Sequence, residues 1–370
     1  MSIVNVDLKK TVDFSYEIEI GYSLMDRLVR DLKSGLVGRA SRIAIITDSN
    51  VADIYAGPIA ERLTKAGYRN NVFVFPAGEK SKVRSVKEKI EDAMIDAGYK
   101  RDSLVIAVGG GVVSDLAGFT AGTFARGIPF INYATTLLAA ADASVGGKTA
   151  VDTPKATNLI GLFHQPAKVY IDIACWKTLP DREIASGLAE TIKHACMADR
   201  DFFAFLEKHI DDILRLDKEA CEHIALRNCQ IKDAVVSLDE KENSLREILN
   251  LGHTVGRAVE TESNYRLLHG EAVSIGLVAE THLAKRCGFM TEAEAERVKA
   301  LLERAGLPVS IPDYIDKAAL LDRLYTDKKV RNDRLRFVLQ DHIGAVVEFA
   351  PDVFSTEVSR DEAREILKTL

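Results

Sequence analysis

The chain has 370 residues, which is long for one hydrophobic core and predicts two domains. Apolar residues account for 47% and charged residues for 28% of the sequence, as in ordinary globular proteins. The formal net charge of -6 leaves no basic excess to neutralise phosphates, so we expect no nucleic acid partner. No apolar run approaches the roughly 20 residues of a membrane span, and we expect no membrane contact.

The N-terminus and the cysteines indicate where the protein works. The first residues lack the basic start and apolar block of a signal peptide. None of the five cysteines belongs to a CxxC pair, and we expect buried, reduced thiols. Together these features predict a cytoplasmic enzyme or binding protein.

Short apolar segments of strand length alternate with helical stretches in the first half of the chain. The N-terminal 21 residues alternate like a pair of strands. Further strands are predicted at 42–47, 71–75, 103–108, 129–133 and 168–173, with helices over 50–67 and 81–98. This order predicts an α/β nucleotide-binding domain over 1–178, with a mostly parallel sheet and helices on both faces.

The second half consists mainly of long amphipathic stretches. Helices are predicted over 182–197, 200–216, 218–236, 244–262, 270–287 and 291–305. Residues 334–349 indicate a small hairpin that turns near 341–344. We therefore expect a mainly α-helical metal- and substrate-binding domain over 179–370, with the ligand in the cleft between the two domains.

Three consecutive glycines, Gly109, Gly110 and Gly111, stand between a predicted strand and a predicted helix. Such a turn lets backbone N–H groups approach a pyrophosphate, and the helix N-terminus adds partial positive charge. The segment is not GxGxxG, and a tight turn without a ligand is the alternative. Glu79 and Lys80 also follow a turn after a strand, as expected at the mouth of such a sheet.

A second glycine segment runs from 142 to 152. Gly146, Gly147, Lys148 and Thr149 resemble the end of a P-loop. The first glycine of that motif would fall at position 142, which is Asp142, so we do not expect a nucleotide triphosphatase. Lys148 beside flexible glycines can still contact an anionic substrate.

A polar stripe follows in SLREILNLGHTVGRAVE. Arg246, Asn250, His253 and Arg257 are separated by 4, 3 and 4 residues, which predicts one face of a continuous helix. The intervening positions are largely apolar, so the stripe favours a functional cleft over an exposed face.

Two histidines are candidates for metal ligands. Glu190, His253 and His269 would give a catalytic ion one carboxylate, two imidazoles and an open position. Glu190 with His194, one turn later, is a competing pair that spacing does not exclude. The other histidines are assigned structural roles, namely His164, His209, His223, His282 and His342.

Eight segments in order between 76 and 337 carry a resemblance to a known family. They are PAGEKSK, GGGVVSDLAGFTAGTFARG, TTLLAAADASVGGKTAVD, NLIGLFHQP, TLPDREIASGLAETIK, LNLGHTVG, LLHGEAV and TDKKVRNDRLRF. In this combination the chain resembles the 3-dehydroquinate synthase family of sugar-phosphate cyclases. The resemblance implies NAD, one divalent metal ion (zinc, with cobalt as an alternative) and a homodimer.

The resemblance also assigns residues to roles. The implied metal ligands are Glu190, His253 and His269. Contacts with NAD fall on Asp48, Asn50, Glu79, Lys80, Gly109, Gly110, Gly111, Asp115, Thr135, Thr136, Asp142 and Thr178. Substrate contacts fall on Arg126, Asn158, Arg246, Asn250 and the pair Lys328 and Lys329, one of which binds phosphate. The catalytic positions are Lys148, Lys193, Lys232 and Arg257.

The implied reaction converts 3-deoxy-arabino-heptulosonate 7-phosphate to 3-dehydroquinate and phosphate. It proceeds by transient oxidation with NAD, phosphate elimination, re-reduction and aldol cyclisation. Two positions depart from the family pattern, because Arg257 replaces a histidine and Thr157 replaces a lysine. One alternative is a related cyclase for sedoheptulose 7-phosphate or an amino-heptulosonate. The other is a catalytically idle relative that binds NAD or a sugar phosphate.

Overall fold

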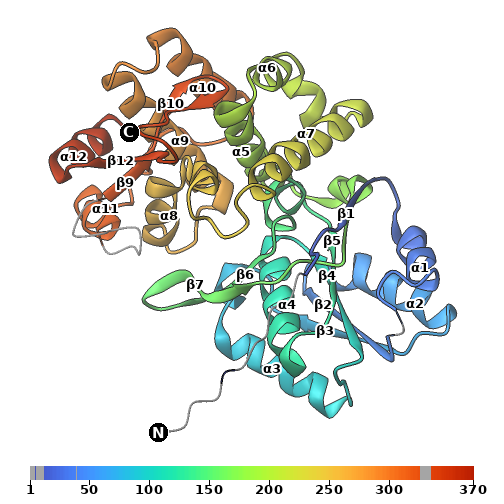
Figure 1. The fold of residues 1–370 in the computed structure, drawn as a ribbon. Coiled ribbons are helices and arrows are strands. Elements are labelled where there is room, and N and C mark those ends of the chain that lie inside the picture. Colours follow the sequence, from blue (N-terminus) through green and yellow to red (C-terminus); the bar gives the residue numbers. More distant parts are fainter. Residues whose placement is uncertain (1–4, 6–11, 39, 326–334) are drawn as a thin grey trace, which may run out of the picture.

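The computed structural model describes residues 5, 12–38, 40–325 and 335–370. Its first half is built on a six-stranded sheet in the order β1-β8-β5-β4-β2-β3, and all five strand pairs are parallel (Figure 1). The strands are β1 Glu17–Gly21, β2 Arg42–Asp48, β3 Asn70–Phe75, β4 Ser103–Gly109, β5 Phe130–Ala134 and β8 Lys168–Asp172. The predicted parallel sheet is confirmed. Of the predicted N-terminal strand pair, the described residues contain only β1.

Helices cover both faces of this sheet. They are α1 Met25–Lys33, α2 Gly57–Lys65, α3 Arg84–Asp96 and α4 Gly111–Thr123. Ile43 and Ile45 of β2 pack in one core with α1 and α2, whereas Ala44 and Ile46 pack in another with α3 and α4. This alternation follows from the two-residue period of a strand. The sheet is therefore buried on both sides, and ligands can reach it only at its edges or strand ends.

A two-stranded hairpin that the apolar pattern did not predict follows β5. Its strands are β6 Lys148–Thr153 and β7 Ala156–Phe163, which pair in antiparallel fashion. Figure 1 shows the hairpin extending from the sheet half on the side of α8. It carries Lys148 and Asn158 to the cleft described below.

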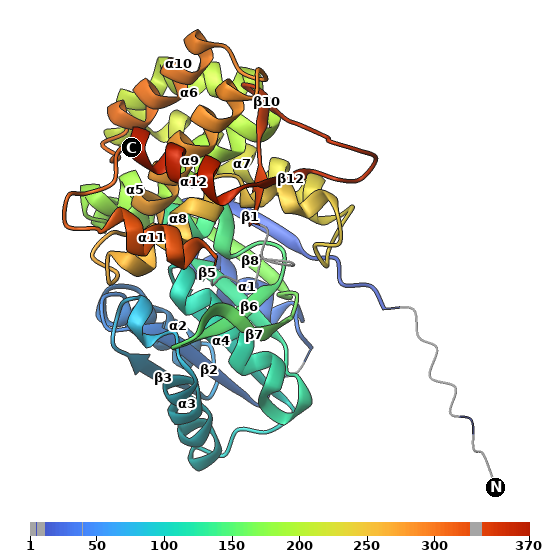
Figure 2. The same ribbon diagram turned by 90° about the vertical axis from the view of Figure 1, so that its left-hand side faces the viewer.

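The second half is mainly helical, as predicted, and lies above the sheet half in Figure 2. Its helices are α5 Asp181–Ala198, α6 Arg200–Leu214, α7 Lys218–Val236, α8 His253–Glu262, α9 His269–Arg286, α10 Glu292–Arg304, α11 Lys317–Leu324 and α12 Arg360–Thr369. Two strand pairs complete it, β9 Leu335–Val338 with β12 Ser355–Val358 and β10 Gln340–His342 with β11 Ala345–Val346. The turn near 341–344 is confirmed, but β9 pairs with β12 instead of within the predicted hairpin.

Burial confirms most expectations about the core and corrects one. Four of the five cysteines are buried, but Cys287 is exposed at the end of α9, so the prediction of uniformly buried thiols is wrong. Helix α5 is buried along nearly its whole length, including its polar residues Glu190, Lys193 and His194. Within the described ranges, no helix combines the length and the apolar character needed to cross a membrane.

Candidate active site in the cleft between the sheet and the helices

A cleft of about 1340 Å³ lies between the carboxyl ends of the sheet strands and the helical half. Most residues predicted to form the site line it, namely Asp48, Asn50, Glu79, Lys80, Gly110, Gly111, Asp115, Thr135, Thr136, Asp142, Lys148, Asn158, Thr178, Lys232, Arg246, Asn250, His253, Arg257 and His269. Four others do not line it, namely Gly109, Arg126, Glu190 and Lys193. Lys328 and Lys329 lie outside the described residues.

The predicted continuous helix over 244–262 is wrong. Leu245–Asn250 forms a 3-10 turn, and α8 begins at His253 after Gly252, whose φ is +78°. A left-handed residue interrupts a right-handed helix, so Arg246 and Asn250 lie on a different element from His253 and Arg257. The polar residues still line one cleft, but they reach it from two elements rather than from one helical face.

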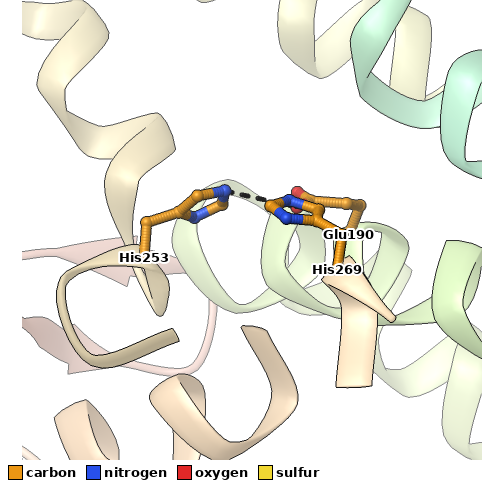
Figure 3. A group of neighbouring side chains, drawn as sticks. All are labelled: Glu190, His253 and His269. Carbon is orange, nitrogen blue, oxygen red and sulfur yellow. Dashed lines mark hydrogen bonds and ion pairs between the residues drawn. The ribbon is translucent and has the colours of Figure 1, made fainter. Parts of the chain in front are cut away.

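Glu190, His253 and His269 come together from three helices, α5, α8 and α9 (Figure 3). The two histidines line the cleft, and Glu190 is fully buried beside them. Glu190 Oε1 lies 3.4 Å from His253 Nε2 and 3.2 Å from His269 Nε2. The opposite ring nitrogens are also held, since His269 Nδ1 lies 3.3 Å from Glu260 Oε2 and His253 Nδ1 lies 3.1 Å from the Leu251 carbonyl oxygen. One carboxylate and two imidazoles suit a zinc-type ion that keeps a position open for substrate.

Charges around these groups shift their pKa values in different directions. Burial lowers the pKa of His253 well below its usual value, which favours the neutral, ligating imidazole. Burial disfavours the charged form of His269 too, but Glu260 and Glu190 outweigh burial and raise its pKa to about 10. Burial alone would raise the pKa of Glu190, whereas Lys193 and His253 pull it below its usual range. A cation placed here therefore meets an ionised carboxylate.

A second cluster shares Glu190. Asp142, Glu190 and His194 also bring one ligand atom each to within 4.8 Å of one another. However, the Lys232 ammonium group lies 2.7 Å from Asp142 Oδ1, and Lys193 Nζ lies 2.5 Å from Glu190 Oε2. Lys193 adjoins both clusters through Glu190, but Lys232 already neutralises Asp142, so a divalent ion is less favourable at this cluster than beside His253. His194 instead contacts Asn228, with 3.0 Å between Nδ1 and Oδ1.

On the sheet side, a buried lysine that the sequence did not single out joins two acidic residues. Lys82 forms ion pairs with Glu79 and with Asp115, the latter at 3.5 Å. Lys80, the lysine chosen from the sequence, is exposed. Burial raises the pKa of Asp115 to about 7, although Lys82 opposes that rise. Glu79–Ser81 forms a 3-10 turn, so the spacing of three residues between Glu79 and Lys82 could have indicated this pair in the sequence.

The glycine turn has the expected position. Gly110 is the N-cap of α4, and no side chain caps the helix, so its first N–H groups are free to bind an anion. A Cβ on Gly110 would lie 3.2 Å from the Thr136 side chain, and one on Gly111 would lie 3.2 Å from Ala143 Cβ. The lack of side chains here keeps the floor of the cleft open beside the helix N-terminus.

Basic side chains gather at the far end of the cleft. Arg246 is 1% exposed, and its guanidinium donates to the carbonyl oxygens of Glu240 and Gly146. Its Nε has no hydrogen-bond partner among the described residues. Glu242, which the sequence reasoning missed, lies 2.7 Å from Lys148 Nζ and accepts from Asn250 Nδ2 at 2.6 Å.

Arg257 lies one turn after His253 on α8 and lines the cleft. Within the described ranges, its guanidinium takes part in none of the ion pairs or hydrogen bonds that the structure contains. It lies near enough to Lys148, His253 and Glu260 to influence their pKa values. This end of the cleft thus offers a permanent cation to an anionic ligand.

Sequence profiles of one family match most of the chain. The profile for "3-dehydroquinate synthase N-terminal" matches residues 72–186, and that for "3-dehydroquinate synthase C-terminal" matches residues 187–330. The chain belongs to the 3-dehydroquinate synthase family. It is 45% identical to a 3-dehydroquinate synthase of Caldanaerobacter subterraneus subsp. tengcongensis, with 100% of both chains covered. It is 44% identical to that of Pelobacter propionicus, over 94% of this chain and 95% of the relative.

Solved structures agree with this family assignment. The 2-epi-5-epi-valiolone synthase ValA of Streptomyces hygroscopicus subsp. jinggangensis, with NAD+ and Zn2+ bound, superposes with a TM-score of 0.86 at 28% identity, covering 99% of this chain and 98% of ValA. A 2-deoxy-scyllo-inosose synthase complexed with carbaglucose-6-phosphate, NAD+ and Co2+ gives 0.85 at 26% identity, covering 95% and 96%. The α/β and helical halves therefore have the architecture of sugar-phosphate cyclases.

Proposed function

We propose that the cleft binds NAD and one divalent metal ion and converts 3-deoxy-arabino-heptulosonate 7-phosphate to 3-dehydroquinate and inorganic phosphate. Family membership and full-length similarity to 3-dehydroquinate synthases support this reaction. The structural observation that carries it is the pair of buried cations, Lys232 and Arg246, at one end of the cleft. The unpartnered Arg246 Nε offers a donor to a carboxylate, which a substrate lacking that group would leave unused.

The residues present fit both cofactors. Glu190, His253 and His269 would hold zinc or cobalt, because their ligand atoms converge and one carboxylate with two imidazoles is a suitable donor set. The N-terminus of α4 and the Glu79–Lys82 pair would hold NAD, because backbone donors and small residues face the cleft there. When bound, NAD accepts and returns a hydride, and the metal ion polarises a hydroxyl oxygen.

The basic residues at the far end of the cleft orient the substrate. Arg246 and Lys232 bind its carboxylate, and Arg257 with Asn250 and Asn158 binds its phosphate. Arg257 cannot accept a proton at ordinary pH, so it stabilises the charge of the departing phosphate without acting as a base. Lys148 is suited to proton exchange, because removal from bulk water lowers its pKa to about 8, with Glu242 opposing that change.

A substrate panel tests this assignment. Wild-type protein and Arg246→Ala are compared on the heptulosonate phosphate and on sedoheptulose 7-phosphate, which lacks the carboxylate. We expect turnover of the heptulosonate phosphate, with kcat/KM lowered by about 10-fold to 100-fold in the variant, as for a lost charged hydrogen bond. Turnover of sedoheptulose 7-phosphate alone would reverse the assignment.

The family also suggests the setting in which the site works. We propose that the protein is a cytoplasmic homodimer with its domain boundary at 178/179, between β8, which ends at Asp172, and α5, which begins at Asp181. Sedimentation equilibrium distinguishes a dimer of two 40.7 kDa chains from a monomer. Limited proteolysis near 178 tests the boundary.

A further inference from the structure

The proposed metal ligand His253 stands at the start of α8, directly after the left-handed residue Gly252. A histidine ligand needs a fixed ring orientation and a fixed tautomer to present one nitrogen to a metal ion. Ring orientation here depends on the Leu251–Gly252 peptide group, whose carbonyl oxygen lies 3.1 Å from His253 Nδ1. A group that fixes the position of this peptide group therefore also fixes the orientation of the His253 ring.

The other end of the same peptide group contacts a buried acid on α9. The N–H of Gly252 donates to Glu280 Oε2 at 2.5 Å, and the N–H of Thr254 donates to Glu280 Oε1 at 3.3 Å. The side chain of Glu280 is 0% exposed. It therefore satisfies two N–H groups at the start of α8 that have no partner within the helix, on both sides of His253.

Close packing leaves this arrangement little freedom. A Cβ on Gly276, one turn before Glu280 on α9, would lie 1.8 Å from the Gly252 carbonyl oxygen. A Cβ on Gly252 itself would lie 2.9 Å from Leu277 Cγ. The backbone at Gly252 packs directly against α9, so the Glu280 carboxylate and the Leu251–Gly252 peptide group have fixed relative positions.

We propose that Glu280 is a positioning residue that acts on His253 through the Leu251–Gly252 peptide group. The carboxylate accepts the peptide N–H, which polarises the group and makes its carbonyl oxygen a better acceptor for His253 Nδ1–H. Nδ1 then keeps its proton, and Nε2, which faces Glu190 at 3.4 Å, keeps its lone pair for the metal ion.

The two proposed histidine ligands are thus each supported by a carboxylate. His269 Nδ1 contacts Glu260 directly at 3.3 Å, whereas His253 contacts Glu280 through one intervening peptide group. Replacement of the acid should weaken metal binding even though Glu280 is not among the described residues that line the cleft. This inference rests on the metal site assigned under the proposed function.

Metal affinity of the apoprotein tests the inference independently of turnover. Zn2+ is titrated against a chromogenic chelator for wild-type protein, Glu280→Gln, Thr281→Val and His253→Ala, and the absorption spectrum of the Co2+ form is recorded. Glu280→Gln keeps the side-chain shape but replaces an acceptor with a donor. Thr281→Val is a matched control, because Thr281 is the next residue of α9, is buried and donates to Gln340 Oε1 at 2.8 Å.

We expect Glu280→Gln to weaken Zn2+ binding about tenfold or more, the range for residues behind metal ligands, with an altered Co2+ spectrum. Thr281→Val should bind like wild type. Wild-type affinity in Glu280→Gln, or equal weakening in both variants, would overturn the inference. Unchanged affinity in His253→Ala would instead refute the metal site itself. Glu280→Asp serves as a second variant if Glu280→Gln does not fold, and the same weakening is expected because the shorter side chain withdraws the acceptor.

Discussion

Glu242 holds Lys148 by an ion pair of 2.7 Å across the cleft, between a loop of the helical half and the β6–β7 hairpin of the sheet half. The same carboxylate accepts from Asn250 at 2.6 Å. Two groups that we assign to substrate are therefore paired with an acid of the protein. An anionic substrate must compete with Glu242 for Lys148 and Asn250. Its attraction to Lys148 depends on the charge of the ammonium group, and therefore on the pKa of Lys148.

The pKa of Lys148 predicts an alkaline limit to activity. Partial desolvation within the cleft is the main cause that lowers this pKa to about 8, so the ammonium form is lost as pH rises through that value. We expect kcat/KM to fall above about pH 8. Lys148→Arg keeps its charge at alkaline pH and should remove this fall, whatever its effect on the maximum rate. An unchanged alkaline limb in that variant would assign the limb to another group.

Arg257 should act as an anion ligand in this chain. Arg257→Ala is expected to raise KM for the phosphorylated substrate by about 10-fold to 100-fold, the effect of one lost hydrogen bond to a charged group. Arg257→Lys keeps the charge and should recover part of the loss. Arg257→His should lower turnover at pH 8, where an ordinary histidine is neutral. A sharp increase in turnover with histidine would mean that Arg257 impairs the site.

The two possible metal clusters give opposite predictions for two histidines. We expect His253→Asn to abolish tight binding of Zn2+, while His194→Asn keeps it, because Lys232 already pairs with Asp142 in the cluster that contains His194. Equilibrium dialysis with atomic absorption measures the bound metal. Loss of metal in His194→Asn alone would favour the cluster with Asp142.

Variants of Lys82 and Lys80 can be compared to test the proposed NAD-binding side of the cleft. Lys82→Met leaves Glu79 and Asp115 without their buried partner, which should reduce stability by about 3–5 kcal/mol and weaken NAD binding. Lys80→Met changes an exposed residue and should alter stability by no more than about 0.5 kcal/mol. Thermal unfolding and calorimetric titration with NAD measure both effects. Stronger loss of NAD binding in Lys80→Met than in Lys82→Met would favour Lys80, the residue chosen from the sequence, as the contact with NAD.

The architecture of the two halves could be predicted from the sequence, because the spacing of apolar residues distinguishes strands from helices. Strands such as β4 are buried throughout, and helices such as α6 and α12 bury one face at a 3.6-residue period. The β6–β7 hairpin was not predicted, since KTAVDT and ATNLIGLF are short and rich in small and polar residues. The partner of β9 was also missed, because strand pairing over this distance depends on tertiary packing.

Features of the site that depend on local conformation and packing could not be predicted from the sequence. Gly252 looks like an ordinary helical glycine, and its left-handed φ depends on contact with α9 and on Glu280. Glu280 has no motif of its own, and its role is visible only once α8 and α9 are packed together. Lys82 was likewise not singled out, because its burial cannot be read from the run PAGEKSK.

The most direct test of the account measures phosphate release from 3-deoxy-arabino-heptulosonate 7-phosphate with NAD and Zn2+ present. We predict equal amounts of inorganic phosphate and 3-dehydroquinate and no net accumulation of NADH, because NAD is reduced and then re-oxidised within one turnover. Absence of phosphate release from this substrate, or accumulation of NADH in step with substrate consumption, would contradict the proposed function.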